Sequence, residues 1–340
     1  MKAAVFYKER GLVIETLPVP EISADQVLIE VSQTGFCGSD HSLIETEGTP
    51  DGTILGHEVS GKVLELGSAV SSVQVGDPVI IRPTFCGQCI GCLRGSPQLC
   101  SNHRRSIGIG DLPGGFAEYV VAFPQMLIPV PKGVDSENAA LAELFAVALH
   151  GIHQAGDKKG SVLVIGSGAV GLALVKLLKL KGYGPVAVSE PNAEKRTLAA
   201  QFGADVTVDP LNENLQAVAF QKTTTAGFET VFECSGIPEG LATAMNTACQ
   251  GGVVCQLSVL YKDIAINPAI MLFKEIFITG AYGNTHAENK QCLKWMAEKA
   301  LDARALVSDR ITLDQLPETY EHRIKKGKTV KALLMIGEAF

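Results

Sequence analysis

Residues 161–178, SVLVIGSGAVGLALVKLL, place a short apolar strand, a glycine-rich turn and an apolar helix one after another. The glycines of the turn follow the spacing G-x-G-x-x-G. In that spacing the first glycine permits a tight turn, the second lets a pyrophosphate approach the backbone, and the third lets the helix pack on the strand. The phosphates then meet the amides at the helix N-terminus. We predict that a dinucleotide cofactor contacts Gly166, Gly168, Ala169, Val170 and Gly171.

The next apolar segment, PVAVSE at 185–190, reads as a second strand and ends in Glu190, 19 residues after Gly171. A carboxylate at this place accepts hydrogen bonds from a ribose 2′-hydroxyl and repels a 2′-phosphate. The sequence therefore favours NAD over NADP. Lys195 and Arg196 follow closely, and such cations can accommodate the 2′-phosphate, so NADP stays open. A glycine-rich turn in a β/α protein that binds no nucleotide is the other alternative.

Two different patterns flank this stretch. From residue 1 to about 147, short alternating apolar runs such as KAAVFY (2–7) are broken by Gly, Pro and Asp. They predict the strands of a β-rich, barrel-like domain. Farther along, strands alternate with helices, one of them expected over 240–252, which predicts a parallel sheet with helices on its faces. After a helix expected over 286–301, a last strand at 329–337 lacks a β/α partner and could return to the first domain.

The composition describes a globular protein with two domains. The chain has 340 residues, 46% of them apolar and 19% charged, and a chain of this length usually exceeds one hydrophobic core. A net charge of −7, a pI near 5.6 and no Lys/Arg-rich run argue against a nucleic-acid partner, because phosphate binding needs clustered positive charge. Glu9 and Arg10 precede any long apolar run, and no stretch of about 18 uncharged apolar residues occurs. We expect a cytoplasmic protein with no membrane segment.

Four cysteines follow the pattern C-x2-C-x2-C-x7-C in residues 85–100, FCGQCIGCLRGSPQLC. Tetrahedral zinc takes four thiolates, and two-residue gaps let a looping backbone place successive sulfurs around one ion. In a reducing compartment this use is favoured over a disulfide framework or buried thiols. Because the protein fills all four positions, we predict a structural zinc site. Its ligands are Cys86, Cys89, Cys92 and Cys100.

A second group of possible metal ligands comes from two separate turns. GFCGSD at 35–40 supplies Cys37, and GHE at 56–58 supplies His57 and Glu58. One thiolate, one imidazole and one carboxylate can hold an ion and leave a position open, as catalysis requires. The alternative is a buried cysteine beside an ordinary structural histidine.

Two neighbours of Cys37 have candidate roles in the same site. Asp40 could accept the second imidazole N–H of His57 and fix its tautomer, or it could only form the turn. Ser39 could pass on a proton, or be an ordinary turn serine.

Together these features make the chain resemble the zinc-dependent medium-chain dehydrogenase/reductase family, nearest its sorbitol, polyol and threonine dehydrogenase branch. The resemblance runs the whole length and includes GFCGSD, LGHEVSGKV, the four-cysteine segment, GGFAEYVV, GSGAVG and FECSG. It implies an α/β fold with a GroES-like catalytic domain, residues 1–147 completed by 284–340, and a doubly wound NAD-binding Rossmann domain, residues 148–283. It also implies an active site between them and a homodimer or homotetramer.

Position by position, the resemblance places a catalytic zinc on Cys37, His57 and Glu58. Glu143 sits where relatives have a second glutamate near the metal, although it could simply be an acidic residue of a helix. Lys195 sits where relatives often place a basic residue against the adenosine ribose.

The chain also departs from the family pattern. Relatives usually carry a relay histidine where this chain has Ser42, and the adjacent His41 is the candidate replacement. Sorbitol dehydrogenases carry a Tyr and an Arg where this chain has Leu43 and Gly283. A site that loses such hydrogen-bonding partners loses discrimination for the hydroxyls they bind, so sorbitol itself is disfavoured.

The implied function is reversible hydride transfer from a secondary alcohol to NAD, the alcohol being a polyol, a sugar-derived alcohol or a cyclic alcohol. Zinc would lower the pKa of the alcohol, and the nicotinamide would take the hydride. One alternative is a zinc-free NADPH quinone or enone reductase on the same scaffold, which would lack the metal ligands. Another is a cofactor-binding sensor without turnover. The sequence names neither the alcohol nor the number of subunits.

Overall fold

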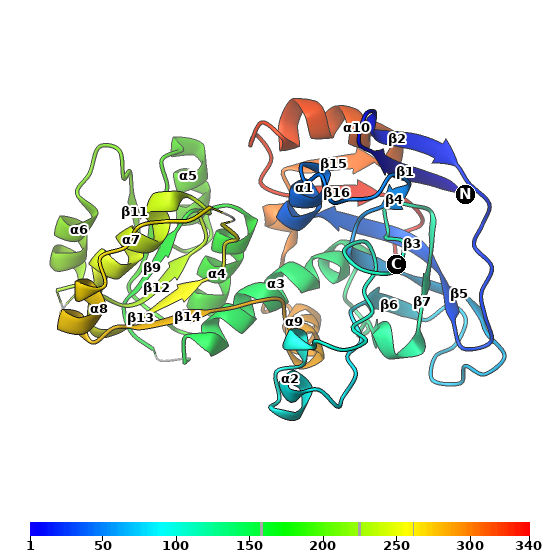
Figure 1. The fold of residues 1–340 in the computed structure, drawn as a ribbon, viewed down its shortest axis with the longest axis horizontal. Coiled ribbons are helices and arrows are strands. Elements are labelled where there is room, and N and C mark those ends of the chain that lie inside the picture. The colour runs from blue at the N-terminus through cyan, green and yellow to red at the C-terminus, as the bar shows by residue number, and fades with distance from the viewer. Residues whose placement is uncertain (157–158, 224–225, 261) are drawn as a thin grey trace. The chain divides into compact units, whose positions relative to one another are not determined.

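The computed structural model describes residues 1–156, 159–223, 226–260 and 262–340. The chain forms two compact units (Figure 1). Unit 1 comprises Met1–Glu143 with Thr285–Phe340, and unit 2 comprises Leu144–Asn284. The first boundary falls inside helix α3 (Ser136–Gln154), four residues before the expected boundary at 147, and the second falls one residue after 283. Within the described ranges, no helix has the length and apolar character that a membrane crossing needs.

Unit 2 contains a six-stranded parallel sheet in the order β11-β10-β9-β12-β13-β14. Its strands are β9 (Val162–Ile165), β10 (Val186–Ser189), β11 (Val206–Val208), β12 (Phe228–Glu233), β13 (Ala248–Gln256) and β14 (Phe277–Gly280). Its helices are α4 (Ala169–Leu180), α5 (Ala193–Gln201), α6 (Leu215–Lys222), α7 (Pro238–Thr247) and α8 (Ala269–Lys274). The strand order reverses beside β9, where open α/β sheets bind their ligands. The predicted doubly wound fold is confirmed.

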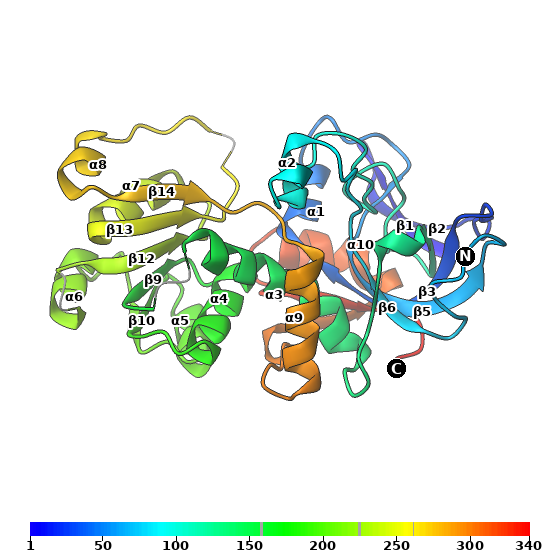
Figure 2. The same ribbon diagram turned by 90° about the horizontal axis from the view of Figure 1, so that it is seen from below.

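The strands of unit 2 form because their residues are apolar on both faces of the sheet. All four residues of β9 and of β10 are buried, which matches a sheet covered by helices on both sides. Figure 2 shows helices packed around these strands. The helix predicted over 240–252 was too long, because α7 ends at Thr247 and the extended backbone from Ala248 pairs with β12.

Unit 1 is built from two sheets. A three-stranded sheet has the order β2-β1-β4, and a seven-stranded sheet has the order β15-β16-β3-β5-β6-β8 with β7 also paired to β3. The strands are β1 (Lys2–Tyr7), β2 (Gly11–Thr16), β3 (Val27–Phe36), β4 (Thr53–Ile54), β5 (Glu58–Leu66), β6 (Pro78–Ile81), β7 (Tyr119–Ala122), β8 (Leu127–Pro129), β15 (Asp309–Thr312) and β16 (Ala332–Met335). The predicted β-rich domain is confirmed.

Helices in unit 1 are few and mostly short. They are α1 (Gly38–Ile44), α2 (Ile90–Leu93), the start of α3, α9 (His286–Ala297) and α10 (Leu316–Thr319), with shorter helical turns η1 (Pro97–Leu99), η2 (Pro124–Met126), η3 (Arg304–Leu306), η4 (Leu313–Gln315) and η5 (Tyr320–Ile324). Two apolar clusters form the core, one around Phe36 and Phe116 and one around Ile29 and Ile81.

The register of three strands positions the predicted metal ligands. β3 runs antiparallel to β5 and pairs Gly35 with Glu58. β16 lies on the other side of β3 and pairs Ala332 with Phe36, so the last strand returns to the first unit as the sequence predicted. The chain therefore leaves β3 at Cys37 beside the point where β5 begins.

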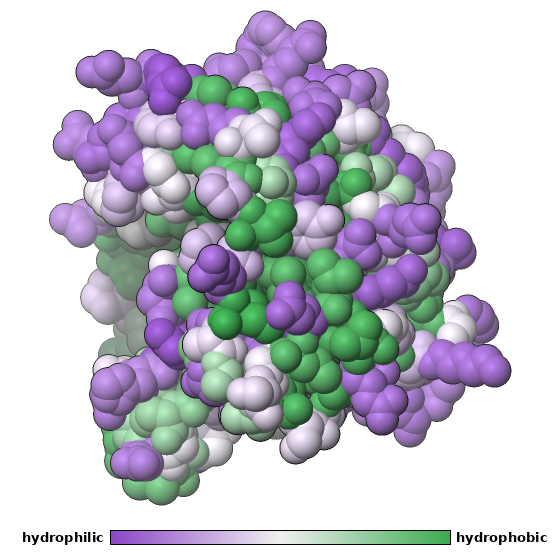
Figure 3. Space-filling model, turned by 90° about the vertical axis from the view of Figure 1, so that its right-hand side faces the viewer, coloured by the Kyte–Doolittle hydropathy of each residue, from purple (hydrophilic) through white to green (hydrophobic). Residues whose placement is uncertain are grey.

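The surface of unit 1 mixes hydrophilic and hydrophobic residues. Figure 3 shows a face on which hydrophobic residues gather near the centre and hydrophilic residues form the border. The large hydrophobic residues of unit 1 with exposed side chains include Val19, Leu64 and Val75. Single exposed hydrophobic side chains of this kind are ordinary on folded proteins.

Candidate active site

Cys37, His57 and Glu58 come together in unit 1. Cys37 immediately precedes α1, and His57 and Glu58 lie at the start of β5. One possible ligand atom from each residue lies within 4.8 Å of the other two. Cys37 is partly exposed, whereas the other two residues are buried. A sulfur, a nitrogen and an oxygen donor at this spacing fit a zinc ion with one position open to a further ligand.

Asp40 holds the two turns of this group together. Its side chain is fully buried. Its Oδ2 accepts a hydrogen bond from the backbone N–H of Cys37 at 2.8 Å, and its Oδ1 accepts one from the N–H of Gly56 at 3.2 Å. The same Oδ1 lies 3.3 Å from Nδ1 of His57. Because an ionised carboxylate only accepts hydrogen bonds, Nδ1 carries the hydrogen and Nε2 keeps the lone pair that a metal needs.

The environment of His57 favours a bound cation. Burial by itself disfavours the charged imidazolium, but the charge of Asp40 and hydrogen bonds with Asp40 and Cys37 raise the pKa of His57 well above 6.5. A positive charge is therefore stabilised at this place. A metal ion bound by His57 would supply that charge in exchange for the proton.

Replacing Asp40 with asparagine should weaken metal binding at this group. The D40N side chain keeps one acceptor oxygen and loses the charge that orients His57, and loss of such an outer partner usually costs about 10- to 100-fold in metal affinity. Equilibrium competition with a coloured chelator measures the change in zinc affinity. D51N, at an exposed aspartate, is the control, and equal affinity of D40N and wild type would show that Asp40 only forms the turn.

The carboxylate of Glu58 has a partner that the sequence did not indicate. Lys331, just before β16, is only 2% exposed. Its ammonium donates to Glu58 Oε1 at 2.6 Å and to the carbonyl oxygen of Phe36 at 3.0 Å. The two residues are separated by 273 positions, and only the pairing of β3 with both β5 and β16 brings them together.

Glu143 also forms a buried ion pair. Arg82 Nη2 donates to Glu143 Oε1 at 3.0 Å, and Arg82 Nη1 donates to the backbone oxygen of His57 at 3.4 Å. Both side chains are buried. Burial lowers the pKa of Arg82, and the charges of Glu143 and Glu58 oppose that shift. Glu143 is not among the residues whose ligand atoms cluster within 4.8 Å, and its role as a zinc ligand stays a prediction.

Ser39 and His41 lie on α1 with different partners. The Oγ of Ser39 lies 3.3 Å from Nε2 of His57, beside the candidate metal position. Nδ1 of His41 lies 3.0 Å from the hydroxyl of Tyr320, which donates to Glu45 at 2.8 Å. Glu45 in turn pairs with Lys325 at 2.9 Å. The proton-relay roles of Ser39 and His41 stay predictions.

The four cysteines of the loop after β6 form a second donor group. Ligand atoms of Cys86, Cys89, Cys92 and Cys100 all lie within 4.8 Å of one another, and all four thiols are free. The sulfur of Cys92 lies 3.9 Å from that of Cys86 and 3.5 Å from that of Cys89. Four sulfurs about 2.3 Å from a tetrahedral zinc are roughly 3.8 Å apart, so the group fits that ion.

Hydrogen bonds from backbone amides also make two of these cysteines suitable as zinc ligands. The sulfur of Cys86 accepts N–H groups from Gln88 at 3.4 Å and from Cys89 at 3.2 Å. These bonds lower the pKa of Cys86, and similar amide bonds lower the pKa of Cys89 to about 5. Burial and its neighbour Cys89 raise the pKa of Cys92 to about 12. An ion bound here would hold all four cysteines as thiolates.

The glycine-rich turn of unit 2 has the geometry that a pyrophosphate requires. Gly166 directly follows β9 and has a φ of +90°. A Cβ at Gly171 would lie 2.0 Å from the backbone oxygen of Gly166, whereas a Cβ at Gly168 would meet nothing within 4 Å. The third glycine thus serves helix packing, and the second leaves open space in front of the first turn of α4.

The side chain of Glu190 is hydrogen-bonded to this turn. Its Oε2 accepts hydrogen bonds from the N–H and the hydroxyl of Ser167 at 2.9 and 3.1 Å, and its Oε1 accepts the N–H of Asn192 at 3.0 Å. Arg196 lies close to this residue: its guanidinium donates to the backbone oxygens of Glu190 and Pro191 at 2.8 and 2.7 Å and pairs with Asp209 at 3.2 Å. A carboxylate therefore lies where the adenosine ribose is expected.

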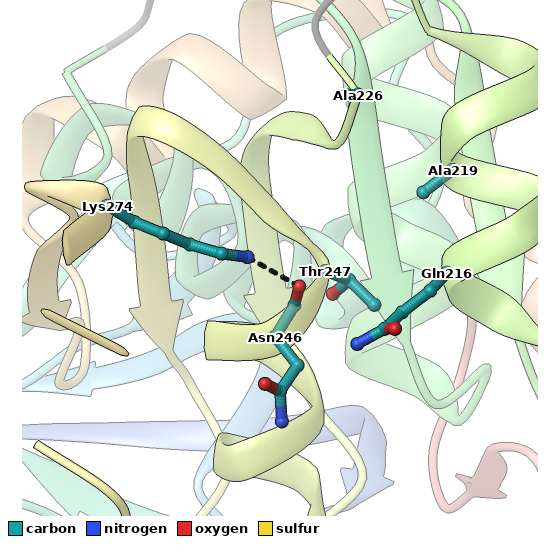
Figure 4. A pocket seen from close by; sticks show the side chains of 6 residues that line it. All are labelled: Gln216, Ala219, Ala226, Asn246, Thr247 and Lys274. Atoms are coloured by element: carbon teal, nitrogen blue, oxygen red, sulfur yellow. Dashed lines mark hydrogen bonds between the residues drawn. The ribbon is translucent and has the colours of Figure 1, made fainter. Parts of the chain in front are cut away.

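Unit 2 also contains a pocket of about 340 Å³ that none of the predicted site residues lines. It is lined by Gln216, Ala219, Ala226, Asn246, Thr247 and Lys274 (Figure 4). The ammonium of Lys274 donates to the backbone oxygens of Met245, Asn246 and Ala248 at 2.6–3.3 Å. Lys274 thus caps the end of α7, which is a structural role.

Comparison with known proteins identifies the family. Residues 23–132 match the alcohol dehydrogenase GroES-like domain, and residues 169–298 match the family described as zinc-binding dehydrogenase. The sorbitol dehydrogenase of Halalkalibacterium halodurans is 31% identical to this chain, over 94% of each protein. The chain belongs to the zinc-dependent medium-chain dehydrogenase/reductase family. It is thus an enzyme of the zinc-type alcohol and polyol dehydrogenases.

Other members of the family are similar along their whole length. The L-threonine 3-dehydrogenase of Escherichia coli strain K12 is 28% identical over 96% of this chain and 96% of its own. A structure described as a zinc-binding dehydrogenase from Sinorhizobium meliloti 1021, bound to NADP, superposes with a TM-score of 0.89 at 32% identity and covers 98% of both chains. Family membership therefore leaves the choice between NAD and NADP open.

Proposed function

We propose that this dehydrogenase oxidises a secondary alcohol, reversibly, by hydride transfer to NAD. The observation that carries the proposal is the donor group of Cys37, His57 and Glu58, assembled in the same chain as a glycine-rich dinucleotide turn. A zinc-free reductase on this scaffold needs no such ligands, so their assembly speaks against that alternative. The substrate would be a small alcohol or ketone.

The two donor groups support one catalytic and one structural zinc. Cys37, His57 and Glu58 leave a position open, whereas the four cysteines fill all positions. When bound at the first group, zinc acts as a Lewis acid toward the alcohol oxygen. A cytoplasmic location is part of the proposal, since both groups need reduced cysteines.

The remaining steps are assigned to side chains of the protein. Asp40 holds the His57 ring by its Nδ1–H and the Cys37 turn by its amide. Ser39 Oγ, beside Nε2 of His57, would accept the proton of the alcohol hydroxyl and pass its own outward. The backbone of the glycine-rich turn would hold the pyrophosphate and so orient the nicotinamide.

The deciding experiment measures metal content and turnover together. We expect two zinc ions per chain and a rise in absorbance at 340 nm when NAD⁺ and a panel of secondary alcohols are added. Sorbitol should rank low in the panel, because Leu43 and Gly283 offer no hydrogen-bonding side chain for its hydroxyls. Two bound zinc ions without oxidation of any alcohol would support the sensor alternative instead.

NAD is favoured over NADP by the place of Glu190, and a substitution tests this. E190S should lower kcat/KM for NAD⁺ about 10- to 100-fold, because hydrogen bonds to a charged group contribute roughly 1.5–3 kcal/mol. It should spare or improve NADP⁺, whose 2′-phosphate the carboxylate repels. E194S, at an exposed residue of α5, is the control. Equal losses for both cofactors would mean that Glu190 only supports the turn at Ser167.

The proposal includes a homodimer or homotetramer. β14 lies at the end of the strand order of unit 2, and its Phe277 side chain is 68% exposed. Leu272 and Phe273, just before it, are also exposed. Open strand edges and clustered hydrophobic side chains are features of protein interfaces. Light scattering should give two or four times the chain mass of 36.0 kDa.

A further inference from the structure

The ammonium of Lys331 is a buried cation beside the candidate metal position. It forms an ion pair with both oxygens of Glu58 and a hydrogen bond to the backbone oxygen of Phe36, the residue before Cys37. A positive charge therefore lies next to Glu58 and next to the backbone of the residue that precedes Cys37.

The pair is fixed by the fold rather than by flexible side chains. Glu58 lies opposite Gly35 in the pairing of β5 with β3, and Lys331 directly precedes Ala332, which lies opposite Phe36. Gly35 makes room for the carboxylate, because a Cβ at this position would lie 1.9 Å from Glu58 Oε2. Any larger residue would push the carboxylate away. The sequence thus keeps Glu58 in contact with Lys331.

A metal ion at Cys37 and His57 would compete with this contact. Glu58 Oε1 accepts the hydrogen bond of the ammonium, whereas Oε2, which forms an ion pair with the same ammonium, accepts no hydrogen bond from the described residues. An ion bound by either oxygen would lie close to the ammonium, and an ammonium close to a dication repels it. Arg82, the other buried cation near this group, donates to Glu143, which lies outside the donor group. Lys331, in contrast, is in direct contact with a carboxylate of the donor group.

We propose that Lys331 is a positioning residue that holds Glu58 and lowers the affinity of this site for its metal, because the ion and the ammonium share the negative charge of one carboxylate. The inference rests on the proposed metal at Cys37, His57 and Glu58. It predicts that removing the lysine charge tightens metal binding, which is the opposite of what general damage to the site would do. It also predicts that the effect acts through Glu58.

The test uses K331M, which removes the charge, and K331Q, which keeps a hydrogen-bond donor. Affinity for Zn²⁺ and Co²⁺ is measured by competition with a chelator, and the visible absorption of bound Co²⁺ reports the ligand set. C37S, which keeps the four cysteines, gives the signal of the second site. Both Lys331 variants should bind the metal about tenfold more tightly or better, because the repulsion between ammonium and dication is removed, and the Co²⁺ spectrum should change. K331R should resemble the wild type.

Two controls show whether the change in affinity comes from the contact between Lys331 and Glu58. K328M removes an exposed charge three residues away and should change nothing. In an E58Q background K331M should lose its effect, because the coupling between the two positions disappears with the carboxylate. Weaker or unchanged metal binding in K331M and K331Q, or an equal gain in E58Q, would overturn the inference. If wild type and C37S bind the same amount of metal, the proposed function itself fails.

Discussion

Replacing Cys37 with serine should abolish alcohol oxidation while the fold stays intact. A serine hydroxyl is a poor zinc ligand at neutral pH, and His57 and Glu58 alone leave too few donors to hold the ion. Since Lewis-acid polarisation is worth several kcal/mol, the loss of kcat/KM should be at least about a thousandfold. Zinc content should fall from two ions per chain to one. Metal analysis and the absorbance change at 340 nm measure both effects.

The control for C37S is the replacement of a cysteine that lies outside both groups of metal ligands. Cys249 is buried in unit 2 and its thiol donates to the backbone oxygen of Gln250, so C249S should keep zinc and activity. Circular dichroism and thermal unfolding show whether C37S remains folded. If C37S has lost one zinc ion and still oxidises the substrate at the wild-type rate, the chemistry assigned to the metal is wrong however well the fold agrees.

The sequence predicts most of the site because its signals are local. Two of these signals are the glycine spacing after β9 and the two-residue gaps between cysteines. Each pattern predicts a single backbone turn, and the geometry of such a turn depends on residues close together in the chain. The turns at Cys37 and His57 are also local motifs. Their meeting follows from the register of β3 and β5, with Gly35 opposite Glu58, which no local pattern specifies.

The partners of the site residues could not be predicted for the same reason. Lys331 lies within the strand predicted over 329–337 and Arg82 directly follows β6, and no local pattern gives either of them a carboxylate partner. Each finds its carboxylate only in the folded chain, across 273 positions for Lys331 and Glu58 and 61 for Arg82 and Glu143. The wrong end of the helix predicted over 240–252 has a similar origin, because the pairing of β13 with β12 decides where α7 stops.

Removing the metal from the four-cysteine loop should unfold this loop and leave the sheets in place. The loop has little core of its own, since its cysteines are partly exposed and the hydrophobic side chains of Ile90, Leu93 and Leu99 are 55–72% exposed. Both apolar clusters of unit 1 lie outside it. We therefore expect its order to depend on bonds to the ion, because in small zinc sites the free energy of metal binding is the free energy of folding.

C92S, or a chelator acting on the wild type, should accordingly raise the rate of proteolysis within residues 86–104 by roughly a hundredfold or more, as expected for a segment whose local opening has become easy. Mass spectrometry of the fragments locates the cuts, and the rest of the chain should resist cleavage. L93S changes an exposed side chain of the same short helix without touching a sulfur, and it should be cleaved as slowly as the wild type. Unchanged resistance in C92S would mean that backbone hydrogen bonds such as Gln88 N–H to the sulfur of Cys86 hold the loop without an ion.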